Sequence, residues 1–472
     1  MRHLIKTIFG LKKINLSSFN LTIFINFILY FIAICFIYTI SAGIQIAKAA
    51  DSASSTSDRI PNRISLSQAV KRAVSEQGNI FRAEHIIAEQ TDLKKAAYAG
   101  LLPNISIVSG GIWTQTKDGF PLFASANGMH EFIGQIRLIV PIFDPKSYAV
   151  ISLARSNLNV ARYRLQLARL VVAAQITQDF YGLILLKDEI KIRQKALNNI
   201  KKIFNATKNE YKAGNLPRLD VVQTGFLVTK LQTDFNVLKS QLKALEHVFA
   251  MEIFYKRFNV NKLSPFLYDT YAFNYKLPTL NMLILNAIKR QPLIKIAKAE
   301  IKSAGADVSI NKAAKLPSVQ GGAAYGEDTI NSVDIPNLGW QFFVAIDIPI
   351  SNFGLHNDYT DAANERLMAL KSAKSALQLS VKKKLAIDYG LAAALKKRLS
   401  GAKILVKESG TVFKMTEEGY LAGEFNALAL QEAQNNSIKA RLKLAKTISQ
   451  FYLAIAQLDI DIGIIPSGGV KL

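Results

Sequence analysis

The residues that most often perform catalysis are few and scattered in this sequence. The histidines show no spacing typical of a metal site; they are His3, His85, His130, His247 and His356. There is no G-x-S-x-G motif, no P-loop and no H-E-x-x-H motif. Acidic side chains on helical segments pair readily with a nearby Lys or Arg, so each is better explained as surface charge. The sequence therefore predicts no enzyme, no catalytic residue, no cofactor and no metal, and no nucleotide site that could supply energy.

Residues 1–49 have the features of a secretory signal. A basic start precedes an almost wholly apolar stretch, Leu21–Ile40, and Ala47-Lys48-Ala49 then places small residues at the two positions that a signal peptidase reads. We predict cleavage after Ala49. The apolar stretch is about long enough to span a bilayer, so an uncleaved anchor is the alternative.

The single cysteine, Cys35, lies inside that apolar stretch. Its neighbours Ile34 and Phe36 are large, whereas a lipid-attachment cysteine needs small residues before it. Lipidation is therefore not expected, and the mature chain would contain neither cysteine nor disulfide.

The charge is strongly basic, with a formal value of +24. Loss of the signal removes five basic residues and no acid, which leaves +19; the five are Arg2, Lys6, Lys12, Lys13 and Lys48. A basic balance can indicate nucleic acid or an anionic membrane. Here lysines and arginines are spread along helical patterns, and export argues against nucleic acid. The charge therefore indicates solvated helix faces that contact anionic lipid.

The chain repeats itself once. Leu102-Pro103 recurs as Leu316-Pro317 at an offset of 214 in residue number, and Tyr211-x-Ala213-Gly214 recurs as Tyr420-x-Ala422-Gly423 at an offset of 209. Two further anchors recur at an offset of 208: Val140-Pro141-Ile142 with Ile348-Pro349-Ile350, and Phe180-Tyr181-Gly182 with Asp388-Tyr389-Gly390. A period this long indicates a duplicated half and not a solenoid of small units.

Two stretches without proline predict very long helices. The seam Leu158, Ala161, Leu165, Ala168 and Val172 lies between residues 146 and 216, and a helix of roughly 65 residues there would be about 100 Å long. Between Ile350 and Ile465, apolar residues at alternating spacings of four and three predict two antiparallel helices joined near Gly419–Gly423. Several shorter helices are the alternative, because Gly390, Gly401 and Gly410 could interrupt the pattern.

Each half also predicts a shorter helix followed by two strands. The first such helix runs from Ser65 to about Leu101, where Pro103 ends it. Apolar and polar residues then alternate along both strand pairs, with loops at about 116–130 and 327–337, and both tryptophans fall on strands. Four strands cannot close a membrane barrel by themselves. We therefore expect several copies to form one barrel that rests on a tube of helices.

In its full mature length the sequence resembles the outer-membrane efflux proteins, the TolC-like family of Gram-negative bacteria. The resemblance rests on the duplicated Leu-Pro, on Val140-Pro-Ile-Phe-Asp144 and Ile348-Pro-Ile-Ser-Asn-Phe-Gly354 after the strands, and on the paired Tyr-x-x-Gly tips. It implies a mostly α-helical protomer with long antiparallel hairpins and four strands, three copies of which form a 12-stranded transmembrane β-barrel on a helical tunnel. It further implies a homotrimer in the cell outer membrane, in contact with outer-membrane lipid.

The resemblance implies a passive duct of a tripartite efflux or type I secretion system. The partners would be a periplasmic adaptor of the membrane fusion class and an inner-membrane pump of RND, ABC or MFS type. A secreted or surface-anchored structural coiled-coil protein is the alternative, but a pure rod would not need four amphipathic strands.

The domain limits follow from the repeat. After the signal, the first repeat is expected at 50–257, with a β-hairpin at 104–141 and a helical tip near 214–220. A linker at 258–278 precedes the second repeat at 279–463, with a β-hairpin at 318–349 and a tip near 420–428. Residues 464–472 form a C-terminal tail.

The resemblance also implies roles for individual residues. Adaptor docking is expected at the tips, at Gly214, Asn215, Leu216, Gly423, Glu424 and Phe425. Asp220 and Tyr420 match an acid and a phenol that latch the tunnel entrance, although Phe425 replaces the basic partner usual in the family. Glu432 would form an acidic ring at the entrance, where the neighbouring position is Ala429. Trp113 and Trp340 would lie at the membrane interface. The plain alternatives are a glycine needed by any helical turn and solvated helix residues.

Overall fold

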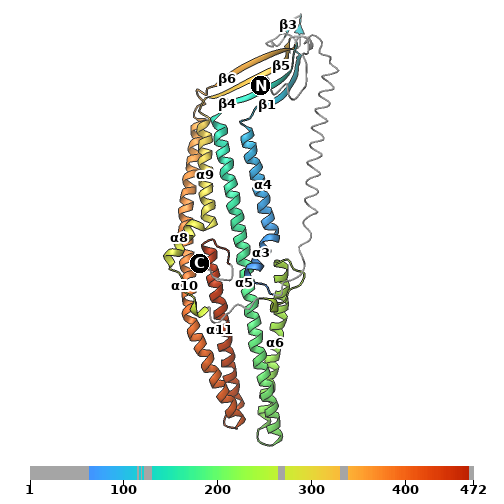
Figure 1. The fold of residues 1–472 in the computed structure, drawn as a ribbon, viewed down its shortest axis with the longest axis vertical. Helices are drawn as coiled ribbons and strands as arrows, with labels where there is room; N and C mark the ends of the chain where they lie inside the picture. The colour runs from blue at the N-terminus through green and yellow to red at the C-terminus, as the bar shows by residue number, and fades with distance from the viewer. Residues whose placement is uncertain are drawn as a thin grey trace, which may run out of the picture. The chain divides into compact units, whose positions relative to one another are not determined.

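The computed structural model describes residues 63–113, 116–118, 120–121, 130–263, 272–329 and 338–466. The predicted signal and its cleavage site lie outside the described residues, as does most of the predicted tail. The chain from Pro61 onward forms one unit. Within it, a four-stranded sheet lies at one end of the helices and two helical tips lie at the other (Figure 1).

The first half begins with two short helices in place of one. α3 (Leu66–Glu76) starts at a capping box, in which the Gln68 backbone N–H donates to the Ser65 hydroxyl and the Ser65 N–H donates to the Gln68 side chain. α4 (Gly78–Ala99) follows Gln77, whose extended backbone interrupts the helix. The prediction of one continuous helix to Leu101 is therefore wrong at Gln77. Gly78, a weak helix former, stands directly after the break.

The long helices of the first half form an antiparallel hairpin. α5 (Pro145–Lys212) has 68 residues, which confirms the predicted length, and α6 (Arg218–Glu252) returns along it. Asp144 caps α5, because its carboxylate accepts from the Lys146 backbone N–H at 3.1 Å. One window of α5 is apolar enough to cross a membrane, but half of it is buried against other parts of the protein. Its apolar character is therefore explained by helix packing.

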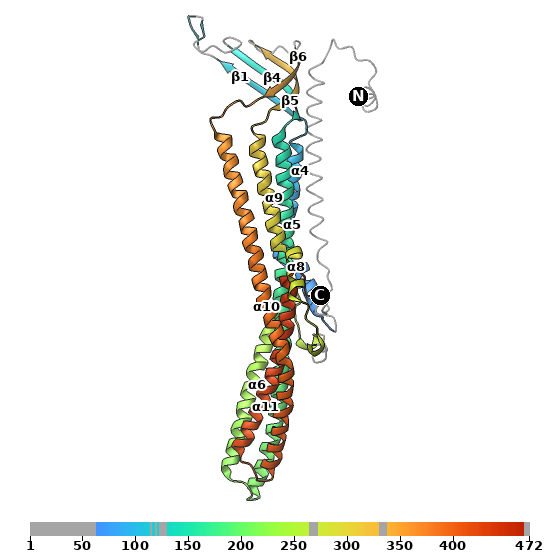
Figure 2. The same cartoon turned by 90° about the vertical axis from the view of Figure 1, so that its left-hand side faces the viewer.

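The second half repeats this order. α8 (Leu280–Arg290) and α9 (Pro292–Ala313) are separated at Gln291, and α10 (Leu355–Leu421) and α11 (Ala427–Asp461) form the second hairpin. The prediction of a long antiparallel pair is confirmed, and Gly390, Gly401 and Gly410 lie inside α10 without ending it. Figure 2 shows both hairpins extending to the end away from the sheet.

Equivalent helices keep a fixed offset in residue number. α6 and α11 differ by 209 at both ends, and α3 and α4 differ from α8 and α9 by 214 at every end. The offset of 208 that pairs Phe180–Gly182 with Asp388–Gly390 is one position out for this part of the hairpins. At 209, Asp179 is the equivalent of Asp388.

The four strands form one antiparallel sheet in the order β1-β4-β5-β6. β1 (Asn104–Trp113) pairs with β4 (His130–Phe143), β4 pairs with β5 (Ser318–Thr329), and β5 pairs with β6 (Gly339–Asp347). Two short strands, β2 (Thr116–Lys117) and β3 (Phe120–Pro121), pair within a segment predicted as loop, and β5 extends into the start of the other predicted loop. These loop limits are therefore corrected. Long helical hairpins with four strands per protomer are confirmed.

The predicted helical seams form the core between helices. Leu158, Ala161, Leu165 and Val172 are buried on α5, as are Leu395, Leu399 and Ala402 on α10 and Ile448, Phe451, Ile455 and Leu458 on α11. Burial of this continuous apolar stripe explains why the helices stay together over many turns.

Candidate functional site

The two hairpins end in turns of the same geometry. Gly214 has φ +85° and Gly423 has φ +82°, each at the second position after its helix ends. The next residue in each turn donates its N–H back to the helix, Asn215 to the Glu210 carbonyl at 2.9 Å and Glu424 to the Gly419 carbonyl at 2.8 Å. This is the left-handed cap that favours glycine. Turn geometry thus explains both glycines without reference to a partner.

The two tips expose different chemistry around this shared turn. At the first tip the Asn215 amide donates to the Glu210 carboxylate at 2.8 Å, and Leu216 packs against the apolar core beneath. At the second tip Glu424 is exposed and Phe425 is 48% exposed. The Phe425 ring lies on Gly419, where an added Cβ would stand 2.5 Å from its Cδ2 atom. A polar tip and an aromatic tip therefore stand at equivalent positions.

Gly419→Ala tests the seat of the Phe425 ring. Alanine in place of glycine inside an exposed helix adds about 1 kcal/mol of helix stability. At position 419 the new methyl group would displace the ring, so we expect faster hydrogen exchange over residues 420–428. Gly401→Ala is the matched control on the same helix, because its Cβ would meet nothing within 4 Å. Equal protection in the two variants would contradict the ring contact.

Tyr420 connects the two hairpins. It is fully buried at the end of α10, and its hydroxyl lies 3.0 Å from the Thr207 hydroxyl of α5. Asp220, in the first turn of α6, is 9% exposed. Burial raises the pKa of Tyr420, the Thr207 hydrogen bond opposes this rise, and the nearby Asp220 adds to it. Among the described contacts the phenol bonds Thr207 and not Asp220, so the predicted acid and phenol are close but form no direct bond.

The core beneath the tips draws on both hairpins. Its buried residues come from α5, α6, α10 and α11; they are Ala196, Leu197, Ile200, Ile203, Leu227, Leu231, Tyr420, Ala427, Leu430 and Ile438. In addition, the Gln434 amide of α11 donates to the Ala196 carbonyl of α5 at 3.2 Å. Separation of the hairpins would therefore expose apolar surface and break the polar contacts made by Tyr420 and Gln434.

Glu432 is exposed on α11, one turn beyond half-buried Ala429. It forms no ion pair within the described part of the chain. A free carboxylate on this surface is compatible with either an entrance ring or an ordinary solvated helix face.

One face of the sheet is apolar and open. Its large side chains are between 40% and 77% exposed; they are Ile105, Ile107, Ile136, Trp340, Phe342, Val344 and Ile346. The other face carries Ser106, Arg137, Ala324 and Gln341 in one cross-strand row. Trp340 is 69% exposed beside Phe342, with 6.2 Å between ring centroids, and Trp113 is the last residue of β1. An apolar face with aromatic residues near strand ends is typical of membrane strands.

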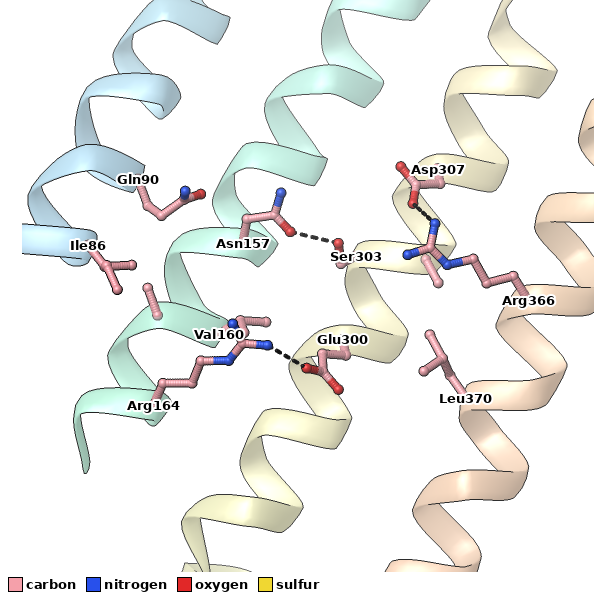
Figure 3. Close-up of a pocket in the computed structure, with 12 residues that line it drawn as sticks. Ile86, Gln90, Asn157, Val160, Arg164, Glu300, Ser303, Asp307, Arg366 and Leu370 are labelled. Carbon is pink, nitrogen blue, oxygen red and sulfur yellow. Dashed lines mark hydrogen bonds and ion pairs between the residues drawn. The ribbon is translucent and has the colours of Figure 1, made fainter. Parts of the chain in front are cut away.

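A cavity of about 470 Å³ lies between α4, α5, α9 and α10 (Figure 3). Its charged side chains are paired, Arg164 with Glu300 at 3.1 Å and Arg366 with Asp307 at 3.8 Å, and the Ser303 hydroxyl donates to Asn157 at 2.7 Å. These contacts join neighbouring helices. The polar groups that Figure 3 joins by dashed lines are satisfied by one another, so they give no sign of a bound ligand. Across the described residues there is also no group of three His, Cys, Asp or Glu that could hold a metal ion.

Two features of the tips escaped the sequence patterns. Thr207 lies far from Tyr420 along the chain, and no local spacing links them. The contact of Phe425 with Gly419 depends on the turn that brings the chain back. Among the described contacts Thr416, the equivalent of Thr207 at an offset of 209, bonds only the Val412 carbonyl of its own helix, so the bond between hairpins at Thr207 has no counterpart in the second repeat.

Comparison with known proteins gives one family. The family described as "Outer membrane efflux protein" matches residues 69–247 and 283–462. The chain is 22% identical over 311 residues to the pyoverdine export outer membrane protein OpmQ of Pseudomonas putida, which covers 64% of this chain and 64% of that protein, less than two thirds of its length. It is 21% identical over 326 residues to the cobalt-zinc-cadmium resistance protein CzcC of Cupriavidus metallidurans, which covers 67% and 74%.

Solved structures share the fold. The outer-membrane channel OprN superposes with a TM-score of 0.72 at 16% identity, over 84% of this chain and 89% of that chain. The outer membrane protein VceC of Vibrio cholerae gives 0.69 at 15% identity, over 84% and 96%. At these identities the likeness concerns the fold, and the fold is that of a protomer of the TolC-like channels.

Proposed function

Because this chain belongs to the outer membrane efflux protein family, we propose that it is the exit duct of an export system whose energy comes from an inner-membrane pump. Family membership places the chain in the outer membrane, with its helices in the periplasm. It also makes the chain a channel protein and not an enzyme, as the sequence predicts.

The observation that carries this proposal is the combination of an apolar sheet with open edges and very long helices. β1 and β6 are the edges of the four-stranded sheet in the described residues, and each has one neighbour only. Open strand edges and an exposed apolar face are both unstable in water. Three copies would supply twelve strands, satisfy every edge and present the apolar face to lipid. The helices of 68 and 67 residues would then extend the pore into the periplasm.

The helical tips are the proposed entrance. The bond between Tyr420 and Thr207 would hold the two hairpins of each protomer together in the closed state, with Asp220 close to the phenol. Three copies of Glu432 near the axis would attract cations and repel one another. The exposed residues at the tips, Asn215, Glu424 and Phe425, would contact the adaptor.

We propose that the duct works in a tripartite efflux or type I secretion system, with a membrane-fusion adaptor and an RND, ABC or MFS pump. The names of its relatives refer to unlike cargo, since one exports pyoverdine and another confers cobalt, zinc and cadmium resistance. The cargo is therefore best found by deleting the gene and profiling drug tolerance, metal tolerance and secreted proteins together.

Fractionation tests the duct against a structural coiled-coil protein. We expect the chain in outer-membrane fractions, as an assembly that migrates faster in unheated gels than its size predicts. Purified protein should form pores in planar bilayers. A monodisperse monomer in detergent that forms no pores would refute the duct and favour the structural alternative.

Removal of the Tyr420 hydroxyl tests the entrance. Tyr420→Phe deletes one hydrogen bond between the hairpins, worth about 1 kcal/mol. With Asp220→Ala as well, we expect the open time of reconstituted channels, and hence the mean ion conductance, to rise several-fold. Planar-bilayer recording measures both.

The duplication supplies the matched controls for this experiment. Tyr211 is the equivalent of Tyr420 but is 43% exposed, and Thr416 is the half-buried equivalent of Thr207. Tyr211→Phe and Thr416→Val should leave conductance unchanged, whereas Thr207→Val should act like Tyr420→Phe. Conductance unaltered in both Tyr420→Phe and Thr207→Val channels would show that this contact does not close the entrance.

A further inference from the structure

The root of each hairpin, where its return helix ends beside the long helix, holds a pair of carboxyl groups. In the first hairpin Asp179 of α5 lies within hydrogen-bond reach of Glu252, the last residue of α6. In the second, Asp388 of α10 lies within the same reach of Asp461, the last residue of α11. The two pairs are related, member by member, by the same offset of 209 that relates α6 to α11. The duplication has therefore kept one arrangement at two places.

The backbone around the two pairs is also the same. Directly after each helix the chain turns through a left-handed residue, Phe254 at φ +55° and Gly463 at φ +82°, which occupy equivalent positions of the two repeats. Glu252 and Asp461 are thus fixed at helix C-termini, where the exposed carbonyl groups disfavour negative charge. Two acids in contact at such a position cannot both be ionised without a large cost.

Each site lacks one hydrogen. Glu252 Oε2 and Asp461 Oδ2 are buried, and the described residues supply neither atom with an N–H or O–H donor. A proton held between the two carboxyl groups would be the missing donor. Burial, followed by the neighbouring Asp179, raises the pKa of Glu252 to about 7. Burial and Asp388 raise the pKa of Asp461 to about 6, against the opposing effect of Lys384.

The two sites differ in one residue. Lys384 forms ion pairs with Asp388 at 3.0 Å and with Asp461, so the second site contains its own cation. Burial lowers the pKa of Lys384, but its bonds to these two acids raise it more, which keeps it charged. Its equivalent in the first repeat is Gln175, a neutral amide that donates to Asp179 at 2.7 Å. Among the described contacts, the second pair alone is neutralised by a fixed charge.

Other charges near the roots do not replace the missing cation. Arg72 of α3 is held by the carbonyl groups of Ile253 and Phe254, each at 3.1 Å, and by the Tyr255 ring. Between α8 and α9, the uncharged Gln291 donates to the Ile460 and Asp461 carbonyl groups. Asp459 lies close to the second root on α11 itself, and its burial raises its pKa to about 7.

We propose that the first hairpin root is a proton-operated clasp, in which one proton shared by Asp179 and Glu252 holds the end of α6 against α5, while the Lys384 ion pairs make the second root less dependent on a proton. The direction of the pH effect follows from the linkage between proton binding and opening of the root. Local opening returns Glu252 to water, where its pKa has the ordinary value of 4.5, so opening releases the proton. Rising pH therefore favours opening up to about pH 7, above which the clasp is fully weakened. The clasp would make the first hairpin respond to periplasmic acidity, whether or not the chain acts as a duct.

Hydrogen exchange of the full-length protein in detergent tests the clasp. After correction for the intrinsic exchange rate, residues 246–255 should be on the order of tenfold less protected at pH 8 than at pH 5.5. Glu252→Gln supplies a permanent donor and should abolish this difference. Gln175→Lys supplies the cation found at the second root and should reduce the difference to the smaller one expected there. Equal protection of the wild-type segment at both pH values, or a difference that persists in Glu252→Gln, would overturn the proposal.

The reciprocal change completes the experiment. Lys384→Gln removes the fixed cation, so the pH dependence of residues 455–464 should increase to that of the wild-type first root. These measurements use an Asp459→Asn background, because Asp459 titrates in the same range. No increase in pH dependence in Lys384→Gln would show that the lysine does not stand in for a proton. Pore activity is measured in parallel, and its absence would refute the duct but leave the exchange result valid.

Discussion

Replacing Gly326 with alanine is expected to prevent assembly of the strand region, whereas the same change at its cross-strand partner Gly339 is expected to have little effect. The two glycines face each other in the β5–β6 ladder. At Gly339 an added Cβ meets nothing within 4 Å. At Gly326, which has φ +155°, it would lie 2.2 Å from the Gly134 carbonyl oxygen and 2.5 Å from the Gln135 Cα atom.

The contrast arises because the clash at Gly326 is with backbone. A side chain can rotate away from a new methyl group, but the two clashing backbone atoms belong to β4, which pairs with β5 at this point. Relief requires that the β4–β5 ladder separates, at a cost of more than about 3 kcal/mol. The strands would then fail to present a continuous sheet to neighbouring copies.

The measurement is the heat-modifiable assembly in outer-membrane fractions. Wild type and Gly339→Ala should give the assembled form, and Gly326→Ala should give unassembled chain or none. An assembled Gly326→Ala protein would mean that β4 and β5 pair in another register. If the wild type itself fails to assemble, the proposed duct is refuted.

The long helices of this fold could be predicted from the local spacing of apolar residues. Proline-free stretches with apolar residues every three or four positions have few alternatives to a helix, and α5 and α10 follow them closely. Alternation over the strand regions likewise predicted which side of the sheet is apolar. The break at Gln77 was missed because no residue pattern marks its extended backbone. The local signal is the glycine that follows it.

The site was less predictable, because its contacts join distant residues. Tyr420 could be singled out, but its partner Thr207 depends on how two hairpins pack. The carboxyl pairs were missed because the two repeats were aligned one residue out of register. An offset of 208 sets Phe180 against Asp388, whereas 209 aligns Asp179 with Asp388 and Glu252 with Asp461. A shift of a single position in register decided whether the duplicated acids could be recognised.

Truncation of Phe451 to alanine is expected to destabilise the protein by about 3–5 kcal/mol. Phe451 is fully buried on α11, close to the hairpin roots. Its ring centroid lies 6.0 Å from Tyr275 and 6.2 Å from Tyr452, and Tyr452 in turn stacks on Tyr181 of α5 at 5.7 Å. Removal of the ring leaves a cavity and breaks an aromatic cluster that joins α11 to α5 and to the segment before α8.

Phe451→Leu is the matched control, because it keeps most of the volume and should cost about 1 kcal/mol. Urea unfolding of the detergent-solubilised protein, followed by the helical circular dichroism signal, measures both values. The cost should be pH-independent, since Phe451 does not titrate, which separates it from the proton-dependent clasp at the neighbouring root. A loss below about 1 kcal/mol in Phe451→Ala would mean that the cluster does not hold the hairpins together, and the stability of the long helices would then have to come from contacts between protomers.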